Sequence, residues 1–491
     1  MEPLNLLLDT NILIPLEDTG RALPSDLAEI KRLCAEFRHQ LCIHPDQRED
    51  IAQDRDERRK AIVESRVDQY PEIPNPPTLS ENEIENFEWR EINRNDKVDN
   101  RLLAALSRGA VDYLVSEDRG IHKKAKKALL SERVFRIPQL LQFLRRQGEK
   151  ELQAPVGIED KYIHEFDVND PFFDSLRLGY EGFNSWWRKC SREHRKVWCV
   201  HDAGRPLAVC VYKVEESNSI AEGQAPLVGD HLKICTFKVG PEIRGLRIGE
   251  RLLHTAFSHA THHGIPWVYL HADASKHKQL IDLCEDYGFE NYGFYGDDIV
   301  YIKSMVPPSG LPNISPIEFA TKYHPHFIDN DYVSKFFVPI KPPFHEKLFP
   351  DISDSHEGVF PAFFQPGSAG NTIKKAYICR SNIKKIHSGD LLLFYRSKDR
   401  KSIEVIGVVE KAEHVTDIVA LNKLVSKRTV YSSDELIEQI EKKCLVVLFR
   451  TMCTFNAIEL EKIRSCGITP SQTISEISNA QYAQLNGENH E

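Results

Sequence analysis

Acidic residues follow short apolar stretches in the N-terminal third of the chain. Asp9 ends the stretch Leu6–Leu8, Asp118 comes soon after Val111–Val115, and Asp99 lies near the start of an apolar helical pattern. If these apolar stretches are parallel strands, their carboxyl ends meet at one edge of the sheet and bring the acids together. Grouped carboxylates repel one another unless cations neutralise them, and oxygen ligands of this kind suit Mg²⁺ or Mn²⁺. Such ions can activate water for phosphodiester hydrolysis.

Further acids could join this group. Glu49 and Asp50 both open a helix after the strand-like Leu41–Pro45, and either fits a second position; Asp96 lies one helical turn before Asp99. Each acid alone also fits a structural role at a helix start or a turn. The predicted catalytic residues are Asp9, Asp50, Asp99 and Asp118, and the predicted metal ligands are Asp9, Glu49, Asp50, Asp96, Asp99 and Asp118.

Residues 1–147 resemble the PIN-domain nucleases. The resemblance rests on Asp9 with Asn11, on Asp50 or Glu49, on Asp99, and on Ser116 with Asp118. It implies a parallel-sheet α/β domain that cleaves RNA with Mg²⁺ or Mn²⁺. The basic run after Asp118, from Arg119 to Lys127, then reads either as a phosphate contact or as a solvated helix face.

A glycine-containing turn between a strand and a helix marks the middle of the chain. The strand-like Leu232–Val239 leads into Gly240–Gly249, and a helical pattern follows over Glu250–His259. Backbone N–H groups and the helix dipole at such a junction favour a pyrophosphate group. The strand-like Trp267–Ala272 and a helical pattern over Lys276–Tyr287 come next.

Residues 157–305 resemble the GNAT acyltransferases, on Val239 and Pro241, the loop Arg244–Gly249, and Gly288–Phe289. The resemblance implies acetyl-CoA, with its pyrophosphate on the loop and its pantetheine paired with the preceding strand, where a β-bulge is expected near 237–239. Arg247 replaces a family glycine, and Cys284 replaces the usual general-acid tyrosine. An active acetyltransferase, a regulatory acyl-CoA-binding module and a structural domain all stay open. The implied coenzyme residues are Phe237, Val239, Arg244, Gly245, Arg247, Ile248 and Gly249.

The C-terminal third contains a basic, strand-rich segment. Residues 374–428 contain 13 Lys and Arg against 6 Asp and Glu, although the whole chain has a net charge of -9. Tyr377, Phe394 and Tyr395 interleave with this charge and are read either as base-stacking side chains or as core. Gly389–Tyr395 followed by Ile406–Glu410 resembles a PUA-like barrel of the ASCH/EVE kind. We place this domain at 320–485, and the resemblance implies RNA binding.

Composition limits the class of protein. Hydrophobic residues make up 41% of the chain, and no stretch reaches the ~20 apolar residues of a membrane span. The start, Met1–Asn5, lacks the basic character of a secretory signal. The 11 cysteines are scattered without paired spacing, as is typical of reduced thiols. We therefore expect a cytoplasmic protein with no membrane partner.

The fold class predicted is multidomain α/β and α+β: a parallel-sheet domain, a mixed-sheet domain and a β-barrel. The leading hypothesis is a bifunctional RNA-directed protein of toxin or stress-response type, both endoribonuclease and N-acetyltransferase. Its expected partners are RNA, with tRNA as one option, acetyl-CoA and an unknown acetyl acceptor; a homo-oligomer stays open. One alternative is an acetyltransferase acting on RNA, aminoacyl-tRNA or protein, with the outer domains as docking surfaces. The other is a non-enzymatic, acyl-CoA-gated RNA-binding sensor.

Overall fold

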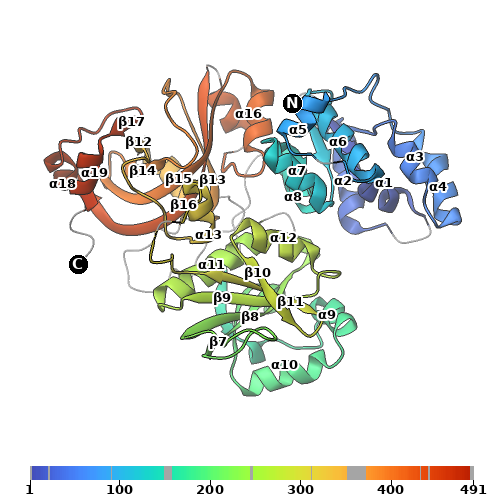
Figure 1. The fold of residues 1–491 in the computed structure, drawn as a ribbon, viewed down its shortest axis with the longest axis horizontal. Helices are drawn as coiled ribbons and strands as arrows, with labels where there is room; N and C mark the ends of the chain where they lie inside the picture. The colour runs from blue at the N-terminus through green and yellow to red at the C-terminus, as the bar shows by residue number, and fades with distance from the viewer. Residues whose placement is uncertain are drawn as a thin grey trace. The chain divides into compact units, whose positions relative to one another are not determined.

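The computed structural model describes residues 3–486 apart from 20–22, 90, 149–156, 244–246, 311, 351–371, 432 and 441–442. The chain forms two compact units, drawn in Figure 1. The first contains residues 1–151, 417–427 and 432–436. The second contains 152–416, 428–431 and 437–491. We describe each unit by itself.

The first unit is built on a four-stranded sheet in the order β2-β1-β3-β4, and every pair in it is parallel. Buried leucines of β1 and the fully buried β3 form its centre, as expected for strands covered on both faces. The strands are β1 (Asn5–Leu8), β2 (Gln40–Cys42), β3 (Tyr113–Val115) and β4 (Val134–Phe135). The helices are α1 (Thr10–Glu17), α2 (Ser25–Glu36), α3 (Gln47–Ala52), α4 (Glu57–Val67), α5 (Glu81–Asn86), α6 (Arg94–Ser107), α7 (Arg119–Lys127) and α8 (Ile137–Gly148).

A short segment from the C-terminal third completes the first unit. Helix α16 (Ile418–Val425) belongs to it, and Lys423 forms an ion pair with Asp112 at 2.5 Å. The amine of Lys427 donates to the carbonyl oxygen of Val134 at 2.7 Å. The predicted limits of the three domains stay predictions, but this unit contains chain from far outside its predicted span.

The second unit contains a seven-stranded sheet in the order β10-β11-β9-β8-β7-β6-β5. Only the β8–β9 pair is parallel among the pairs in this sheet. Helices α11 (Ile248–His262) and α12 (Lys278–Asp286) pack on one face, and α10 (Phe183–Arg192) packs on the other (Figure 1). The other elements are α9 (Asp174–Gly179), β5 (Glu159–Tyr162), β6 (Lys196–Asp202), β7 (Arg205–Glu216), β8 (Asp230–Val239), β9 (Trp267–Ala272), β10 (Glu290–Tyr295) and β11 (Asp298–Ser304).

A six-stranded sheet in the order β13-β16-β15-β14-β12-β17 follows in the same unit. The sheet is mixed, because β12 and β14 are parallel while the other pairs are antiparallel. Within the described residues no pairing joins β13 to β17, so closure into the predicted barrel is not confirmed. Its strands are β12 (Lys335–Ile340), β13 (Lys374–Cys379), β14 (Leu391–Arg396), β15 (Ser402–Val415), β16 (Cys444–Glu459) and β17 (Ser475–Ile477). Helices α13 (Pro316–Lys322), α14 (Pro342–Leu348), α18 (Leu460–Ser465) and α19 (Asn479–Asn486) accompany the chain here, and α17 (Ser433–Gln439) is divided between the two units after Leu436.

The aromatic residues of this last sheet are core residues. Tyr377, Phe394 and Tyr395 are 7%, 0% and 5% exposed, so the interpretation that they stack on bases is wrong. Phe394 packs against Phe449 and Tyr377 instead. The alternation of charge and aromatics in the sequence reflects buried strands whose neighbouring loops are basic.

None of the described helices has the length and apolar character needed to cross a membrane.

Candidate acid cluster and candidate coenzyme site

Three of the predicted acids lie at the carboxyl ends of β1 and β3 and on the adjoining helix α6. Asp9 directly follows β1 and accepts hydrogen bonds from the Ser116 hydroxyl and, at 2.6 Å, from the Asn11 amide. Asp118 caps α7 by accepting the Ile121 N–H at 2.9 Å. The strand ends therefore place these two side chains by ordinary cap and turn interactions.

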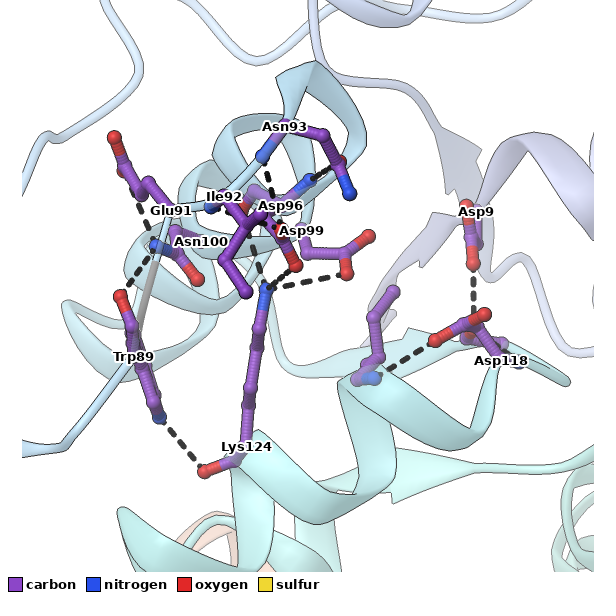
Figure 2. A network of polar contacts seen from close by, with 12 residues as sticks. Asp9, Trp89, Glu91, Ile92, Asn93, Asp96, Asp99, Asn100, Asp118 and Lys124 are labelled. Carbon is purple, nitrogen blue, oxygen red and sulfur yellow. Dashed lines mark hydrogen bonds and ion pairs between the residues drawn. The ribbon is translucent and has the colours of Figure 1, made fainter.

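Asp99 reaches the same space from α6. A side chain at Gly120 would lie 2.8 Å from Asp118 Oδ1 and 3.8 Å from Asp99 Oδ2, so both carboxylates border the space that this glycine leaves open. The Lys124 amine forms ion pairs with Asp99 at 3.3 Å and with Asp96 at 3.1 Å. Figure 2 shows Lys124 reaching both acids of α6, with Asp9 and Asp118 in the same view.

The electrostatics of this acid cluster, Asp9, Asp99 and Asp118, reflect burial and mutual repulsion. Burial raises the pKa of Asp9 to about 7; the charges of Asp99 and Asp118 add to this, while the Ser116 hydroxyl opposes it. Burial likewise raises the pKa of Asp99 to about 6, with Asp118 adding to the shift and Lys124 opposing it. The charges of neighbouring carboxylates therefore add to the upward pKa shifts of Asp9 and Asp99.

The other predicted ligands have structural roles. Asp96 completes the capping box of α6 and holds Lys124, and Glu49 and Asp50 both pair with Arg94, the latter at 3.9 Å. Across the described residues, no three His, Cys, Asp or Glu side chains are arranged to hold a metal ion. In this structure the amine of Lys124, which pairs with Asp99, supplies the positive charge beside the acids. The six-residue metal set stays a prediction.

In the second unit, two parallel strands separate. The pairing of β8 with β9 runs from His231–Trp267 to Ile234–Leu270 and ends there, although β8 continues to Val239. On its other side, β8 stays paired with β7 as far as Val239, and the Gly240 N–H is donated to Leu207 O at 2.8 Å. In an antiparallel ladder the N–H groups alternate in direction. Those of Val239 and Phe237 therefore face the gap beside β9.

The strand irregularity lies before the expected position. Val211 pairs with Thr236 and Tyr212 with Ile234, so Cys235 is the extra residue on β8. We had expected the bulge near 237–239. A bulge bends its strand and increases the local twist. Here it coincides with the point where β8 leaves β9.

Helix α11 starts beside this gap. Arg247 precedes the helix with φ 55°, in the left-handed region that glycine adopts at least cost. Ile248 is buried in the core. A Cβ on Gly249 would lie 3.1 Å from the Leu283 side chain of α12 and 3.6 Å from the Phe237 ring of β8, so a larger residue would press on both side chains. Arg244 and Gly245 lie outside the described residues.

Cys284, which replaces the family's general-acid tyrosine, and the nearby Tyr287 are both buried. Cys284 is 0% exposed within the core, where burial raises the pKa of its thiol. Tyr287 is 4% exposed, and its hydroxyl bonds to Glu250. The hydroxyl of Tyr287 is thus engaged by Glu250, and Cys284 is a core residue.

His271 was missed by the sequence reasoning. It follows Leu270, where β9 leaves β8, and its ring stacks on the half-exposed Tyr295 with centroids 5.0 Å apart. The ring bonds to the Ile220 backbone, while Nε2 has no hydrogen-bond partner in the described part of the chain. Burial lowers the pKa of His271, Lys233 adds to this, and Asp298 and Glu215 oppose it. The alternation in Trp267–Ala272, which places His271 on one face with Tyr269, was the available signal.

Comparison with known proteins identifies one part of the chain. The model of the acetyltransferase (GNAT) family matches residues 161–289. No curated protein matches the chain.

Solved structures that resemble parts of the chain include an ASCH protein from Zymomonas mobilis, at 13% identity over 31% of this chain and 94% of that one, with a TM-score of 0.25. An aminoglycoside 6'-acetyltransferase type Ii is 18% identical over 30% of this chain and 99% of its own, with a TM-score of 0.23. NAA60 of Arabidopsis thaliana, in complex with a bisubstrate analogue, is 15% identical over 30% and 99%, also at 0.23. Scores this low carry no argument about function. The family match is what shows that residues 161–289 are a GNAT acetyltransferase domain.

Proposed function

We propose that the second unit transfers an acetyl group from acetyl-CoA to an amine acceptor. The observation that supports this most is the separation of β8 from β9 after Ile234, directly before the start of α11. The gap presents the N–H groups of Phe237 and Val239, which suit the amide-bearing pantetheine arm. The N-terminus of α11 suits a pyrophosphate. Arg247 to Gly249, at the start of this helix, would lie beside the phosphates.

His271 is the residue we assign as the base. Its Nε2, which has no hydrogen-bond partner within the described residues, lies on β9 just past the strand separation, and burial lowers the pKa of the ring and so favours its neutral form. A neutral imidazole can take the proton that an ammonium acceptor must lose. The acceptor nitrogen then forms a bond to the acetyl carbon, the carbon–sulfur bond breaks, and the CoA thiolate takes a proton from solvent. The exposed Tyr295 ring beside His271 would contact the acceptor.

The experiment is calorimetric titration of the full chain with acetyl-CoA, followed by thiol release with a panel of amines, peptides and total RNA. Saturable binding with acceptor-dependent thiol release supports the transferase. Binding without release under any acceptor would favour the acyl-CoA-gated sensor. Absence of binding would contradict both.

A second candidate function is metal-dependent RNA cleavage by the first unit. It is supported by the convergence of Asp9, Asp99 and Asp118 and by the resemblance of residues 1–147 to PIN nucleases. The C-terminal sheet would supply the RNA-binding module, and a toxin or stress-response role would follow from the combination. Incubating the chain with total RNA, with and without Mn²⁺ or Mg²⁺, tests this function. RNA cleavage that neither depends on added metal nor falls when Asp9 is replaced would contradict this function.

A further inference from the structure

The C-terminal sheet contacts the start of helix α11. Ile373, which directly precedes β13, is 1% exposed and packs within the same core cluster as Ile248 and Leu252 of α11. Both segments belong to the second unit. A residue from beyond the acetyltransferase domain is therefore part of that domain's core, beside the predicted coenzyme loop.

Lys374 then presents its backbone to two side chains of α11. Its N–H donates to Glu250 Oε1 at 3.0 Å, and its carbonyl oxygen accepts from Arg247 Nη1 at 3.1 Å. Strand β13 is at the edge of its sheet, and the Thr451 N–H donates to Ile373 O. In this register both backbone groups of Lys374 face away from β16. Arg247 and Glu250 therefore take the place of a neighbouring strand.

Arg247 and Glu250 also form an ion pair with each other, and Glu250 is only 5% exposed. Burial would raise the pKa of Glu250, but Arg247, the Tyr287 hydroxyl and the Lys374 N–H together hold it below its usual range. Hydrogen bonds to an ionised buried group are among the stronger ones in proteins. The contacts with Glu250 and Lys374 therefore fix the side chain of Arg247, whose left-handed backbone directly precedes α11.

Charged side chains also join the end of helix α12 to the C-terminal sheet. Arg450 donates to the Asp286 carbonyl oxygen at 3.1 Å and pairs with Glu410 at 2.6 Å. Arg428 also pairs with Glu410, whose pKa burial would raise but which Arg428 and Arg450 hold well below its usual range. Removing one member of such a network leaves an uncompensated charge. The end of α12 is thus also held to the C-terminal sheet.

We infer that the edge strand β13 is part of the acetyl-CoA site of this chain: the backbone of Lys374 positions the Arg247–Glu250 pair, and so the phosphate-facing start of α11. The inference rests on the proposed coenzyme function. By thermodynamic linkage, whatever binds the C-terminal sheet and shifts β13 changes acetyl-CoA affinity, and acetyl-CoA changes that binding by the same factor.

The test compares Lys374→Pro with Lys374→Ala in the full chain. Proline removes the lysine side chain and the N–H that donates to Glu250, and because this N–H is not part of the sheet ladder, the strand tolerates proline here. Alanine keeps the N–H and removes the side chain. A hydrogen bond to a charged group predicts about tenfold weaker acetyl-CoA binding for Lys374→Pro. Lys374→Ala should stay within about twofold of the wild type.

Two further measurements separate positioning from general damage. S-acetylpantetheine lacks the pyrophosphate, so Lys374→Pro should not change its affinity, whereas a loosened fold would weaken both ligands. Glu250→Gln combined with Lys374→Pro should bind acetyl-CoA no more weakly than the weaker single variant, because both act through one contact. If Lys374→Pro does not fold, Glu250→Gln alone should still weaken acetyl-CoA binding while sparing S-acetylpantetheine.

The outcomes are distinguishable. A wild type that does not bind acetyl-CoA overturns the proposed function and this inference together. A wild type that binds, with unchanged affinity in Lys374→Pro or tighter binding in Glu250→Gln, overturns the inference alone. Equal losses for acetyl-CoA and S-acetylpantetheine would also overturn it.

Discussion

The acid cluster and the strand gap both lie where parallel strands end, yet they differ in what carries the chemistry. In the first unit, the ends of β1 and β3 present carboxylate side chains. In the second, β8 presents backbone N–H groups because β9 turns away. When a site consists of side chains, the sequence shows which residues could form it but not whether they come together. When a site consists of backbone N–H groups, it depends on how the strands pair, and residue types do not show this.

The largest effect expected in this comparison is at Asp118. If the cluster cleaves RNA, Asp118→Asn should lower metal-dependent cleavage by at least about 100-fold, since the carboxylate charge is lost while the cap acceptor remains. Glu117→Gln is the matched control on the neighbouring residue. Cleavage assays with total RNA measure both. Equal RNA cleavage by the wild type and Asp118→Asn would show that the acid cluster has a structural role and does not cleave RNA.

At the strand gap, His271→Gln should lower acetyl transfer by about 10²- to 10⁴-fold. The affinity for acetyl-CoA should not change, because the coenzyme contacts are on β8 and α11. In the wild type, the rate should fall only as pH drops below the lowered pKa of His271, since protonation then occupies Nε2. Initial rates across pH, compared with the variant His263→Gln, check this. If His271→Gln transfers acetyl groups at the wild-type rate, His271 is not the base.

Asp9→Asn should stabilise the metal-free chain at pH 8. The pKa of Asp9 is raised in the fold, so its contribution to stability is present below pH 4 and is lost as pH rises through about 7. A neutral amide avoids that loss, which is roughly 2–4 kcal/mol for a shift of this size. Denaturant unfolding of both proteins at pH 4 and pH 8 measures the difference. A variant less stable at pH 8 than the wild type would show that burial does not disfavour the charged carboxylate of Asp9 in this way.

The smallest effect expected is at Lys124. Lys124→Gln removes the cation that opposes the upward shift of Asp99, so the pKa of Asp99 should rise from about 6 by about one unit. Carbon-detected NMR titration of the side-chain carboxyl measures it. Lys123→Gln, on the same helix, is the control. An unchanged titration would mean that the ion pair with Lys124 does not form in solution.

Much of the architecture followed from local patterns. The strand over Trp267–Ala272 has its expected ends, and β8 and α11 differ from the expected ranges by only a few residues. These elements were predictable because apolar periodicity and turn chemistry are local. The acids Asp9 and Asp118 were likewise predictable from their places after apolar strands.

What could not be predicted depends on long-range partners. Arg94 forms ion pairs with Glu49 and Asp50, and Lys124 forms one with Asp99. The sequence spacing of these residues does not reveal the pairs. The end of the β8–β9 pairing is set by a bulge at Cys235, whose residue type gives no such signal. His271 became a candidate only when its strand was seen to leave its neighbour.

The central claim is that the gap between β8 and β9 holds acetyl-CoA, and hydrogen exchange tests it most directly. Amide exchange of the full chain should be followed by mass spectrometry with and without acetyl-CoA. Peptides covering residues 235–239 should become protected on coenzyme addition, while peptides covering β1 should exchange as before. Unchanged exchange at 235–239 under saturating acetyl-CoA would contradict the account.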